Sequence, residues 1–255
     1  MTKNKKLLIV ANWKMNPDNI EKAKEIFKGI RVVTKELKNI STVVCPPFIY
    51  LSDLEKINDG SIVLGAQDVF WENEGSFTGE ISPTMLKNEG EGYVIVGHSE
   101  RRSLGENDEM ISKKIKSAIK IGLKVILCIG ERDRDIHGEY LHFLRQQIIN
   151  SIGNLSKKSL EKLVIAYEPI WAIGKKDNEA MKANELHEMT IFIKKVMVEI
   201  YGQKYGLITP VLYGGSVTYK NAEDLITQGQ VQGLLIGRES LKVENFGKLL
   251  KDLEK

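Results

Sequence analysis

Short runs of apolar residues recur along the whole chain, and most of them lack the alternating polar residues of a half-buried strand. Continuous apolar runs of this length are typical of strands in a parallel sheet that is covered on both faces. We therefore predict eight strands, at Leu7–Ala11, Thr42–Cys45, Ile62–Ala66, Tyr93–Val96, Val125–Ile129, Leu163–Tyr167, Val211–Tyr213 and Gly233–Ile236.

Stretches with apolar residues at every third or fourth position lie between these runs and predict amphipathic helices. The first, Asn19–Leu37, carries Ile20, Ala23, Phe27 and Ile30 at this spacing, with lysines and glutamates between them. The same pattern predicts further helices at Glu109–Ile121, Tyr140–Ile152, Glu185–Tyr201, Asn221–Thr227 and Phe246–Leu253.

Strand and helix alternate without a change of composition and without a linker rich in Pro, Gly or Ser. Eight such units in a chain of 255 residues favour an α/β fold with one (β/α)8 barrel, a single domain over residues 1–255. The alternative is an open, doubly wound sheet. That fold usually has a glycine-rich turn after its first strand, whereas this chain has Asn12, Trp13 and Lys14 there.

The composition narrows the classes of partner. Lys and Arg number 37 and Asp and Glu 34, a net charge of +3, which gives little support to nucleic-acid binding. The two cysteines, Cys45 and Cys128, cannot form a secreted disulfide framework and suit a reducing compartment. The first apolar run ends at Ala11, too early for a signal sequence or a membrane span. We expect a soluble cytoplasmic protein with no nucleic-acid or membrane partner.

In a (β/α)8 barrel the chemistry lies at the carboxyl ends of the strands, so the residues there are the first candidates for function. Asn12 and Lys14 follow the first strand and share a face, because side chains alternate along a strand. A lysine here is often only a solvated charge at the rim. An ammonium beside an amide is also a good anchor for an anion or a carbonyl oxygen.

The fourth and sixth predicted strands end in titratable residues. His98 precedes Ser99, a plausible helix N-cap, and the positive end of that helix would favour a neutral imidazole that donates a hydrogen bond. A lone histidine is as readily structural. Glu168 follows five apolar residues, and it either marks the edge of the core or faces a ligand. The apolar loop Ile170–Gly174 after it favours the second reading, since such loops usually fold over something.

Glycines follow the last two predicted strands, in Tyr213–Ser216 and Leu235–Arg238. Each pair could form only a tight turn. On adjacent strands they favour a phosphate site, because glycine lets backbone N–H groups approach a ligand closely. The four histidines have no zinc-ligand spacing, and no Gly-x-x-x-x-Gly-Lys loop exists, so we expect no metal and no cofactor.

Several of these strand ends belong to longer motifs. In chain order they are N-W-K-M-N (Asn12–Asn16), G-A-Q (Gly65–Gln67), F-T-G-E-I-S (Phe77–Ser82), V-G-H-S-E-R-R (Val96–Arg102), C-I-G-E (Cys128–Glu131), A-Y-E-P-I-W-A-I-G (Ala166–Gly174) and Y-G-G-S-V (Tyr213–Val217). With these motifs in this order, the chain resembles the triosephosphate isomerase family over essentially its whole length. The resemblance implies a TIM barrel that interconverts dihydroxyacetone phosphate and D-glyceraldehyde 3-phosphate.

The resemblance also implies the roles of five residues. Glu168 would be the base that moves a proton between the carbons beside the carbonyl group, and His98 the neutral electrophile. Lys14 would add positive charge beside the enediolate, Asn12 would position the substrate oxygen, and Glu100 would support the others as a nearby carboxylate. A carboxylate base with a neutral imidazole is a known pairing for this enzyme. The residues implied in substrate and phosphate binding are Asn12, Lys14, Gly174, Ser216, Gly237 and Arg238, the last four through backbone N–H groups.

A homodimer is implied as well. The long loop Asp68–Ser82 would insert Phe77 and Thr78 beside Asn12 and His98 of the partner subunit. The alternative is a surface loop that packs on its own barrel.

The chain departs from the family's common pattern at three places. Lys175, Lys176, Asp177 and Asn178 follow Gly174 where a small Thr-Gly-Lys is usual. Arg238 replaces the second glycine of a pair, so that its N–H can still donate while its guanidinium either points outward or reaches the phosphate. The stretch Arg102–Glu106 is one residue shorter than usual.

Three other functions are compatible with parts of this pattern. An isomerase of a four-carbon ketose phosphate, of the erythrulose phosphate type, could use the same barrel and base. A phosphate-binding protein without catalysis would keep the glycines and lose the base or the electrophile, yet both remain here. A serine hydrolase would need a glycine two residues after Ser99, where Arg101 stands.

Overall fold

The computed structural model describes residues 6–175 and 180–254, and their strands form a closed parallel barrel in which each strand pairs with its neighbours in sequence and β1 closes against β8. Its strands are β1 (Leu7–Asn12), β2 (Ile40–Cys45), β3 (Val63–Ala66), β4 (Tyr93–Val96), β5 (Lys124–Ile129), β6 (Leu163–Tyr167), β7 (Val211–Tyr213) and β8 (Gly233–Ile236).

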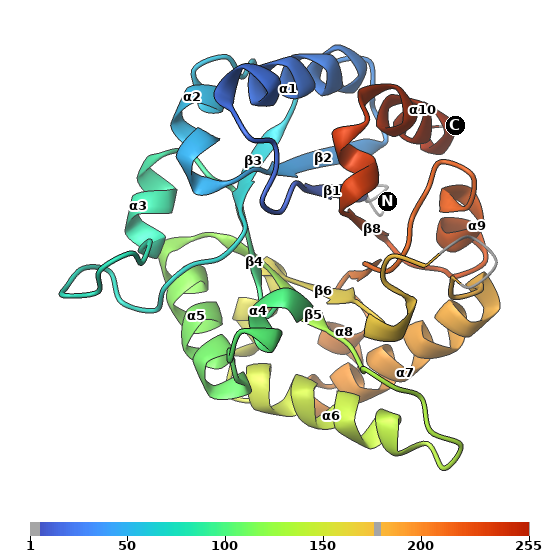
Figure 1. Ribbon diagram of the computed structural model, residues 1–255. Helices are drawn as coiled ribbons and strands as arrows, with labels where there is room; N and C mark the ends of the chain where they lie inside the picture. The colour runs from blue at the N-terminus through green and yellow to red at the C-terminus, as the bar shows by residue number, and fades with distance from the viewer. Residues whose placement is uncertain (1–5, 176–179, 255) are drawn as a thin grey trace.

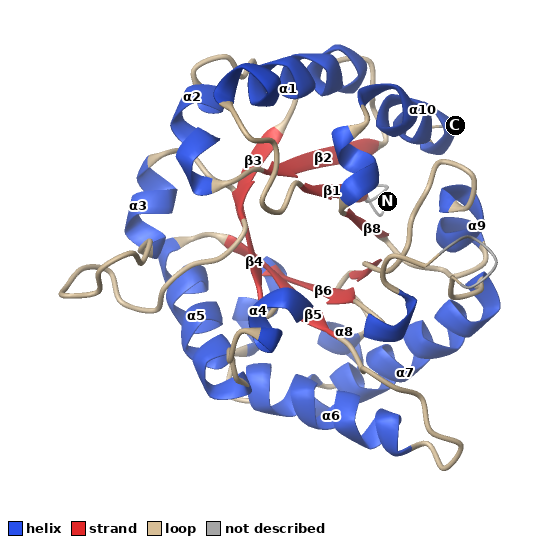
Figure 2. Cartoon of the chain, viewed as in Figure 1, coloured by secondary structure: helices blue, strands red, loops and turns tan. Residues whose placement is uncertain are grey.

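Helices surround the barrel on its outside (Figures 1 and 2). The α-helices are α1 (Ile20–Thr34), α2 (Leu51–Glu55), α3 (Pro83–Asn88), α4 (Ser99–Ser103), α5 (Asp108–Ile121), α6 (Glu139–Ile152), α7 (Ala183–Tyr201), α8 (Gln203–Gly206), α9 (Ala222–Thr227) and α10 (Val243–Leu253). Short 3-10 helices are η1 (Phe48–Tyr50), η2 (Lys157–Lys162), η3 (Ile170–Ala172) and η4 (Arg238–Leu241).

Both faces of the strands are buried, which explains why their sequences lack polar alternation. In β1, Leu8 and Val10 belong to the cluster inside the barrel, whereas Ile9 and Ala11 belong to the larger cluster between barrel and helices. Both clusters exclude water from apolar side chains, the main source of folding free energy. The predicted α/β barrel is confirmed.

The predicted helices are all present, with small shifts at their ends. Helix α1 begins at Ile20 because the Asn19 side chain accepts a hydrogen bond from the Lys22 N–H, as an N-cap does. It ends at Thr34 rather than Leu37, whose N–H donates to the Thr34 carbonyl in a tighter turn. The prediction missed the short helices α2, α3 and α8, which have too few turns for a periodic pattern.

Cys45 and Cys128 lie inside the barrel and are fully buried free thiols. Burial raises the pKa of both, because a thiolate is poorly solvated there. None of the helices within residues 6–175 and 180–254 combines the length and apolar character needed to cross a bilayer.

Glu91 is a fully buried carboxyl group in the turn between α3 and β4, and no described residue donates a hydrogen bond to either of its side-chain oxygens. Burial is the main cause that raises the pKa of Glu91; its own backbone N–H opposes this, the charges of Glu89 and Glu55 add to it and Lys87 lowers it, so that the pKa moves from 4.5 to about 7. Between pH 4.5 and about pH 7, the Glu91 carboxyl group holds a proton in the folded protein that it has lost in the unfolded chain. Stability therefore falls as pH rises from about 4.5 to about 7.

We expect Glu91→Gln to stabilise the protein at pH 8 by up to about 3 kcal/mol, because the amide keeps the shape of the protonated carboxyl and carries no charge. The gain should vanish near pH 5. Thermal unfolding from pH 5 to pH 9 measures it, with Glu36→Gln, at an exposed carboxylate after α1, as the control. A gain that is independent of pH would contradict the proposed cause.

Candidate active site

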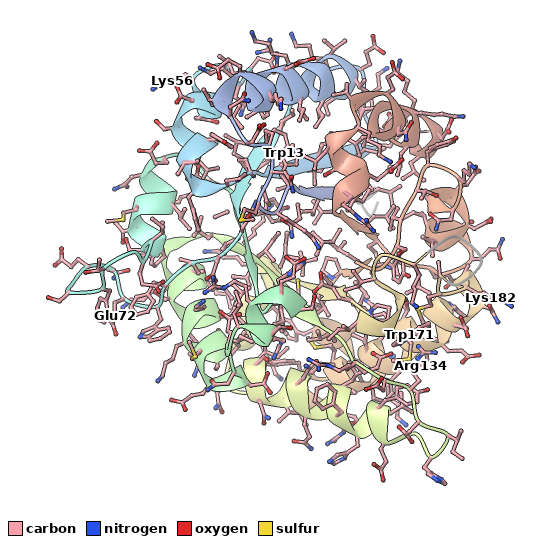
Figure 3. The ribbon with its side chains drawn as sticks, in the orientation of Figure 1. Trp13, Lys56, Glu72, Arg134, Trp171 and Lys182 are labelled. Carbon is pink, nitrogen blue, oxygen red and sulfur yellow. The ribbon has the colours of Figure 1, made fainter. Side chains whose placement is uncertain are left out.

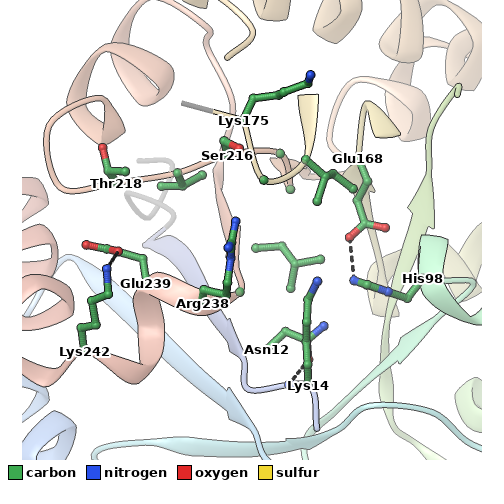
Figure 4. A pocket seen from close by; sticks show the side chains of 17 residues that line it. Asn12, Lys14, His98, Glu168, Lys175, Ser216, Thr218, Arg238, Glu239 and Lys242 are labelled. Carbon is green, nitrogen blue, oxygen red and sulfur yellow. Dashed lines mark hydrogen bonds and ion pairs between the residues drawn. The ribbon is translucent and has the colours of Figure 1, made fainter. Parts of the chain in front are cut away.

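A cavity of about 450 Å³ lies at the mouth of the barrel, where the carboxyl ends of β1, β4, β6, β7 and β8 meet (Figure 4). It brings together residues that are more than 200 positions apart in the sequence. Eight of the predicted site residues line it: Asn12, Lys14, His98, Glu168, Gly174, Ser216, Gly237 and Arg238.

The Glu168 carboxylate is 2% exposed and lies against the start of α4. Its Oε1 is 3.2 Å from His98 Nε2, and its Oε2 accepts a hydrogen bond of 3.2 Å from the Ser99 N–H. Burial raises the pKa of Glu168, but His98 and the Ser99 N–H lower it by more, so that it lies below its usual value. The carboxylate is therefore ionised at neutral pH.

A glycine fixes the backbone at Glu168. A Cβ on Gly130 would lie 1.8 Å from the Glu168 carbonyl oxygen, so any larger residue would push β5 and β6 apart at this point. The Glu168 N–H also donates to the Ile129 carbonyl at 2.7 Å. The base is thus mounted on rigid backbone rather than on a free loop.

His98 is itself the N-cap of α4, which corrects the assignment of that role to Ser99. Its Nδ1 accepts a hydrogen bond of 3.2 Å from the Glu100 N–H, so the ring carries its proton on Nε2, facing Glu168. Burial lowers the pKa of His98, but the charge of Glu168, its hydrogen bond to the ring and the charge of Glu100 together raise the pKa by more. The imidazole is therefore placed to donate from Nε2 into the cavity.

Asn12 is the last residue of β1, and Lys14 lies two residues after it. The Asn12 Oδ1 accepts a hydrogen bond of 3.0 Å from the Lys14 N–H, which supports the positive φ of 55° at Lys14. The Lys14 ammonium lies 2.6 Å from Glu100 Oε1, and the other oxygen of Glu100 is 3.7 Å from His98 Nδ1. Glu100 does not line the cavity; it pairs with Lys14 and lies beside the Nδ1 side of the His98 ring.

Sequence reasoning missed Glu131, which anchors the loop that follows Glu168. This buried carboxylate accepts hydrogen bonds at its Oε1 from the Tyr167 hydroxyl (2.8 Å), Trp171 Nε1 (2.9 Å) and Arg134 Nε (3.1 Å). Its backbone carbonyl accepts from the Ile170 N–H at 2.9 Å. Trp171 and Arg134 are labelled next to one another in Figure 3, and the guanidinium carbon of Arg134 lies 4.9 Å from the centroid of the Trp171 ring. A carboxylate directly after β5, in the motif C-I-G-E, was the available signal.

The far end of the cavity is formed by the loops after β6, β7 and β8. Gly174 has a φ of 73°, a left-handed conformation that favours glycine. The Ser216 hydroxyl donates to the Ala172 carbonyl at 2.8 Å and so ties the β7 loop to η3. Of the four residues after Gly174, Lys175 lines the cavity, with its ammonium directed away from Lys14 in Figure 4. Lys176, Asp177 and Asn178 lie outside the described residues.

The loop Asp68–Ser82 projects from the barrel beside α3, at the left of Figure 1. Glu72, labelled in Figure 3, lies on this projection. Phe77 and Thr78 are exposed and do not line the cavity, although the Phe77 ring packs 4.6 Å from that of Phe70 in the same loop.

Two other chemistries find no support in the described residues. No group of three or more His, Cys, Asp and Glu side chains within 6–175 and 180–254 is arranged to hold a metal ion. The ring nitrogens of His98 face the Glu100 N–H and Glu168, so neither activates the Ser99 hydroxyl as a hydrolase would require.

Comparison with known proteins decides the family. The family model described as triosephosphate isomerase matches residues 7–253. The chain belongs to the triosephosphate isomerase family. A triosephosphate isomerase of Fusobacterium nucleatum is 42% identical over 251 residues, which cover 97% of this chain and 98% of that protein. One of Dehalococcoides mccartyi is 40% identical over 95% of both chains.

A solved structure agrees with these sequence matches. The crystal structure of triosephosphate isomerase from Bartonella henselae has a TM-score of 0.87 and 32% identity, and the match covers 98% of this chain and all of that one. The predicted family, barrel fold and enzyme class are thereby confirmed, with an isomerase of triose phosphates favoured over a four-carbon isomerase. The roles of individual residues remain predictions.

Proposed function

We propose that this cavity interconverts dihydroxyacetone phosphate and D-glyceraldehyde 3-phosphate, with Glu168 as the base. The observation that carries the proposal is the pairing of a buried, ionised carboxylate with an imidazole that donates from Nε2, 3.2 Å away. Moving a proton between the carbons beside a carbonyl group requires a base for the C–H bond and donors for the oxygen that gains charge.

The reaction begins with an exchange of partners at His98. The Glu168 carboxylate accepts a hydrogen bond from the Ser99 N–H and lies against His98 Nε2. It leaves both groups to reach a substrate carbon. The substrate oxygen then takes its place on Nε2–H. Because Glu168 is the group that raises the pKa of His98, its departure leaves burial to favour the neutral ring. A neutral donor suits an enediolate oxygen without protonating it outright.

The proton transfer then needs no other reactant. The Glu168 carboxylate takes a proton from C1 of dihydroxyacetone phosphate, and the C–H electron pair forms the C=C bond of the enediolate while the carbonyl oxygen gains negative charge. Lys14, held by Glu100, lowers the energy of that charge. The proton of the C1 hydroxyl moves to the oxygen on C2, which leaves the negative charge on the C1 oxygen. Glu168 then returns its proton to C2 while the C1=O bond of the aldehyde forms, and the carboxylate regains its charge.

The phosphate would bind at the opposite end of the cavity, to backbone N–H groups of Gly174, Ser216, Gly237 and Arg238. Binding energy from a group remote from the reacting carbons can hold the η3 loop over the substrate and exclude water. Exclusion of water protects the enediolate from loss of phosphate.

A coupled assay of the purified protein in both directions tests this function. We expect turnover of both triose phosphates and a kcat/KM for D-erythrulose phosphate at least about 100-fold lower, since that ratio measures differential binding of the transition state. Turnover of the four-carbon substrate alone would favour the alternative isomerase. If neither substrate is turned over, the result would favour a phosphate-binding protein without catalysis.

We also propose that the protein is a cytoplasmic enzyme of glycolysis and gluconeogenesis and a homodimer through the loop Asp68–Ser82. Large apolar side chains are exposed in the segments after four adjacent strands, β1 to β4: Met15 (95%), Ile49 (79%), Phe77 (43%), Met85 (55%) and Leu104 (82%). Apolar side chains gathered on one side of the barrel are typical of an interface between subunits.

We expect the protein to sediment at about twice its chain mass of 28.8 kDa and Met15→Glu to raise the dimer dissociation constant at least about 100-fold, because the charge would be desolvated. Phe143→Glu is the control, since Phe143 is an exposed apolar residue on α6, away from these segments. Sedimentation equilibrium over a range of concentrations measures both. A mass near 29 kDa at every concentration would remove the dimer.

A further inference from the structure

Arg238 brings a cation into the part of the cavity where the phosphate is proposed to bind. It is the first residue of η4, directly after β8, and its side chain lines the cavity. In Figure 4 the guanidinium points toward Ser216, with Glu239 and Lys242 on its other side. Its Nη2 fills the space beside Gly174, since a Cβ placed there would lie 3.1 Å from it.

Apart from Lys175, whose ammonium points away from Lys14 in Figure 4, the other charges of the cavity are already matched. Glu239 lies 3.1 Å from Lys242 Nζ and accepts a hydrogen bond of 2.6 Å from Asn245. Lys14 is paired with Glu100. Arg238, by contrast, has no hydrogen bond or ion pair with any residue in the described part of the chain. This end of the cavity therefore carries positive charge that lacks a counter-ion.

A second cation approaches the same region from β1. A Cβ on Gly237 would lie 3.3 Å from Lys14 Cε and 3.9 Å from Lys14 Nζ, so Gly237 separates Lys14 from Arg238. Because Lys14 is paired with Glu100, the uncompensated charge beside Gly237 is that of Arg238, and it matches an anion better than a neutral ligand. A guanidinium can also donate to two phosphate oxygens at once and carries a full positive charge, whereas backbone N–H groups are uncharged.

We propose that the Arg238 guanidinium is a direct ligand of the substrate phosphate, additional to the backbone N–H groups. The identity of the ligand as a substrate phosphate rests on the proposed function, whereas the presence of an anion site at Arg238 does not. Arg238 is accordingly a binding residue that contacts the phosphate, and it spans Gly174 and Ser216 when the ligand is bound. It should lower KM far more than it changes kcat, because it touches a group remote from the reacting carbons.

Binding of inorganic phosphate, followed by calorimetry, tests the proposal without any turnover. We expect Arg238→Gln to weaken phosphate binding about 10- to 100-fold and Arg238→Lys to recover most of the loss. Arg132→Gln is the matched control, an exposed arginine in the loop after β5 that does not line the cavity. The melting temperature of Arg238→Gln should be close to that of the unchanged protein, because no hydrogen bond or ion pair within the described residues is lost.

The outcomes separate the two proposals. Unchanged phosphate binding in Arg238→Gln, or an equal loss in Arg132→Gln, would overturn the role of Arg238 even if the protein is an active isomerase. A loss confined to Arg238→Gln supports the role, including in a protein that fails to isomerise triose phosphates, where the proposed function alone would be lost. In an active enzyme, a rise in KM of about 10-fold or more with kcat within about twofold is the supporting kinetic result.

Discussion

Glu168→Gln should lower kcat about 1,000-fold with little change in KM, since a positioned general base contributes about 100- to 10,000-fold. The amide has nearly the shape of the carboxylate, and its oxygen can still accept from the Ser99 N–H. It cannot take a proton from carbon. Steady-state kinetics in both directions measures the loss, and unchanged turnover would show that the base is wrongly assigned.

The same variant has a second readout that loss of packing alone would not produce. Because Glu168 raises the pKa of His98 against the effect of burial, its replacement by an amide should lower that pKa. A titration of the His98 ring followed by NMR measures this change. Glu109→Gln, which removes an exposed carboxylate on α5, should leave both kcat and the His98 titration as they are.

Most of the barrel and the reacting end of the cavity could be predicted from the sequence, for a simple geometric reason. Strands buried on both faces must be apolar throughout, so their ends are conspicuous where the first polar residue appears. Asn12, His98 and Glu168 are such residues, and a closed parallel barrel brings all their carboxyl ends to one mouth.

The remaining features depend on contacts between segments whose individual patterns do not reveal them. The role of N-cap passes from Ser99 to His98 through a one-residue difference in where α4 begins. The direction of the Arg238 guanidinium depends on which neighbours already have counter-ions. Glu131 has the same sequence context as a rim carboxylate, yet it accepts from Tyr167 at the end of β6, from Trp171 in the loop after β6 and from Arg134 after β5.

Lys114 is a further example, because a lysine in an amphipathic helix is normally solvated. In α5 it falls on the apolar face with Ile111, Ile115 and Ala118 and is 1% exposed. Its ammonium lies 2.8 Å from Asp68 Oδ1 and also bonds Glu106, both buried carboxylates. The spacing of three from Ile111 and four to Ala118 was the signal in the sequence.

We expect Lys114→Met to lower the free energy of unfolding at pH 7 by about 3–5 kcal/mol, because removing one partner of a buried ion pair leaves an uncompensated charge. Asp68 keeps Arg101, 2.9 Å away, but Glu106 loses its cation. Denaturant unfolding measures the loss. The adjacent Lys113→Met is the control, since its pair with Glu109 is exposed and contributes at most about 1 kcal/mol.

The charge, rather than the shape of Lys114, is the expected cause, and two comparisons separate them. Adding Glu106→Gln to Lys114→Met should recover part of the lost stability, and Lys114→Arg, which keeps the charge, should lose less than Lys114→Met. A deficit unaffected by either would mean that packing alone is responsible. Asp68 begins the projecting loop Asp68–Ser82, so the proposed dimer should weaken with Lys114→Met and strengthen again in the double variant. The buried lysine would then connect the stability of one barrel to the surface through which two barrels associate.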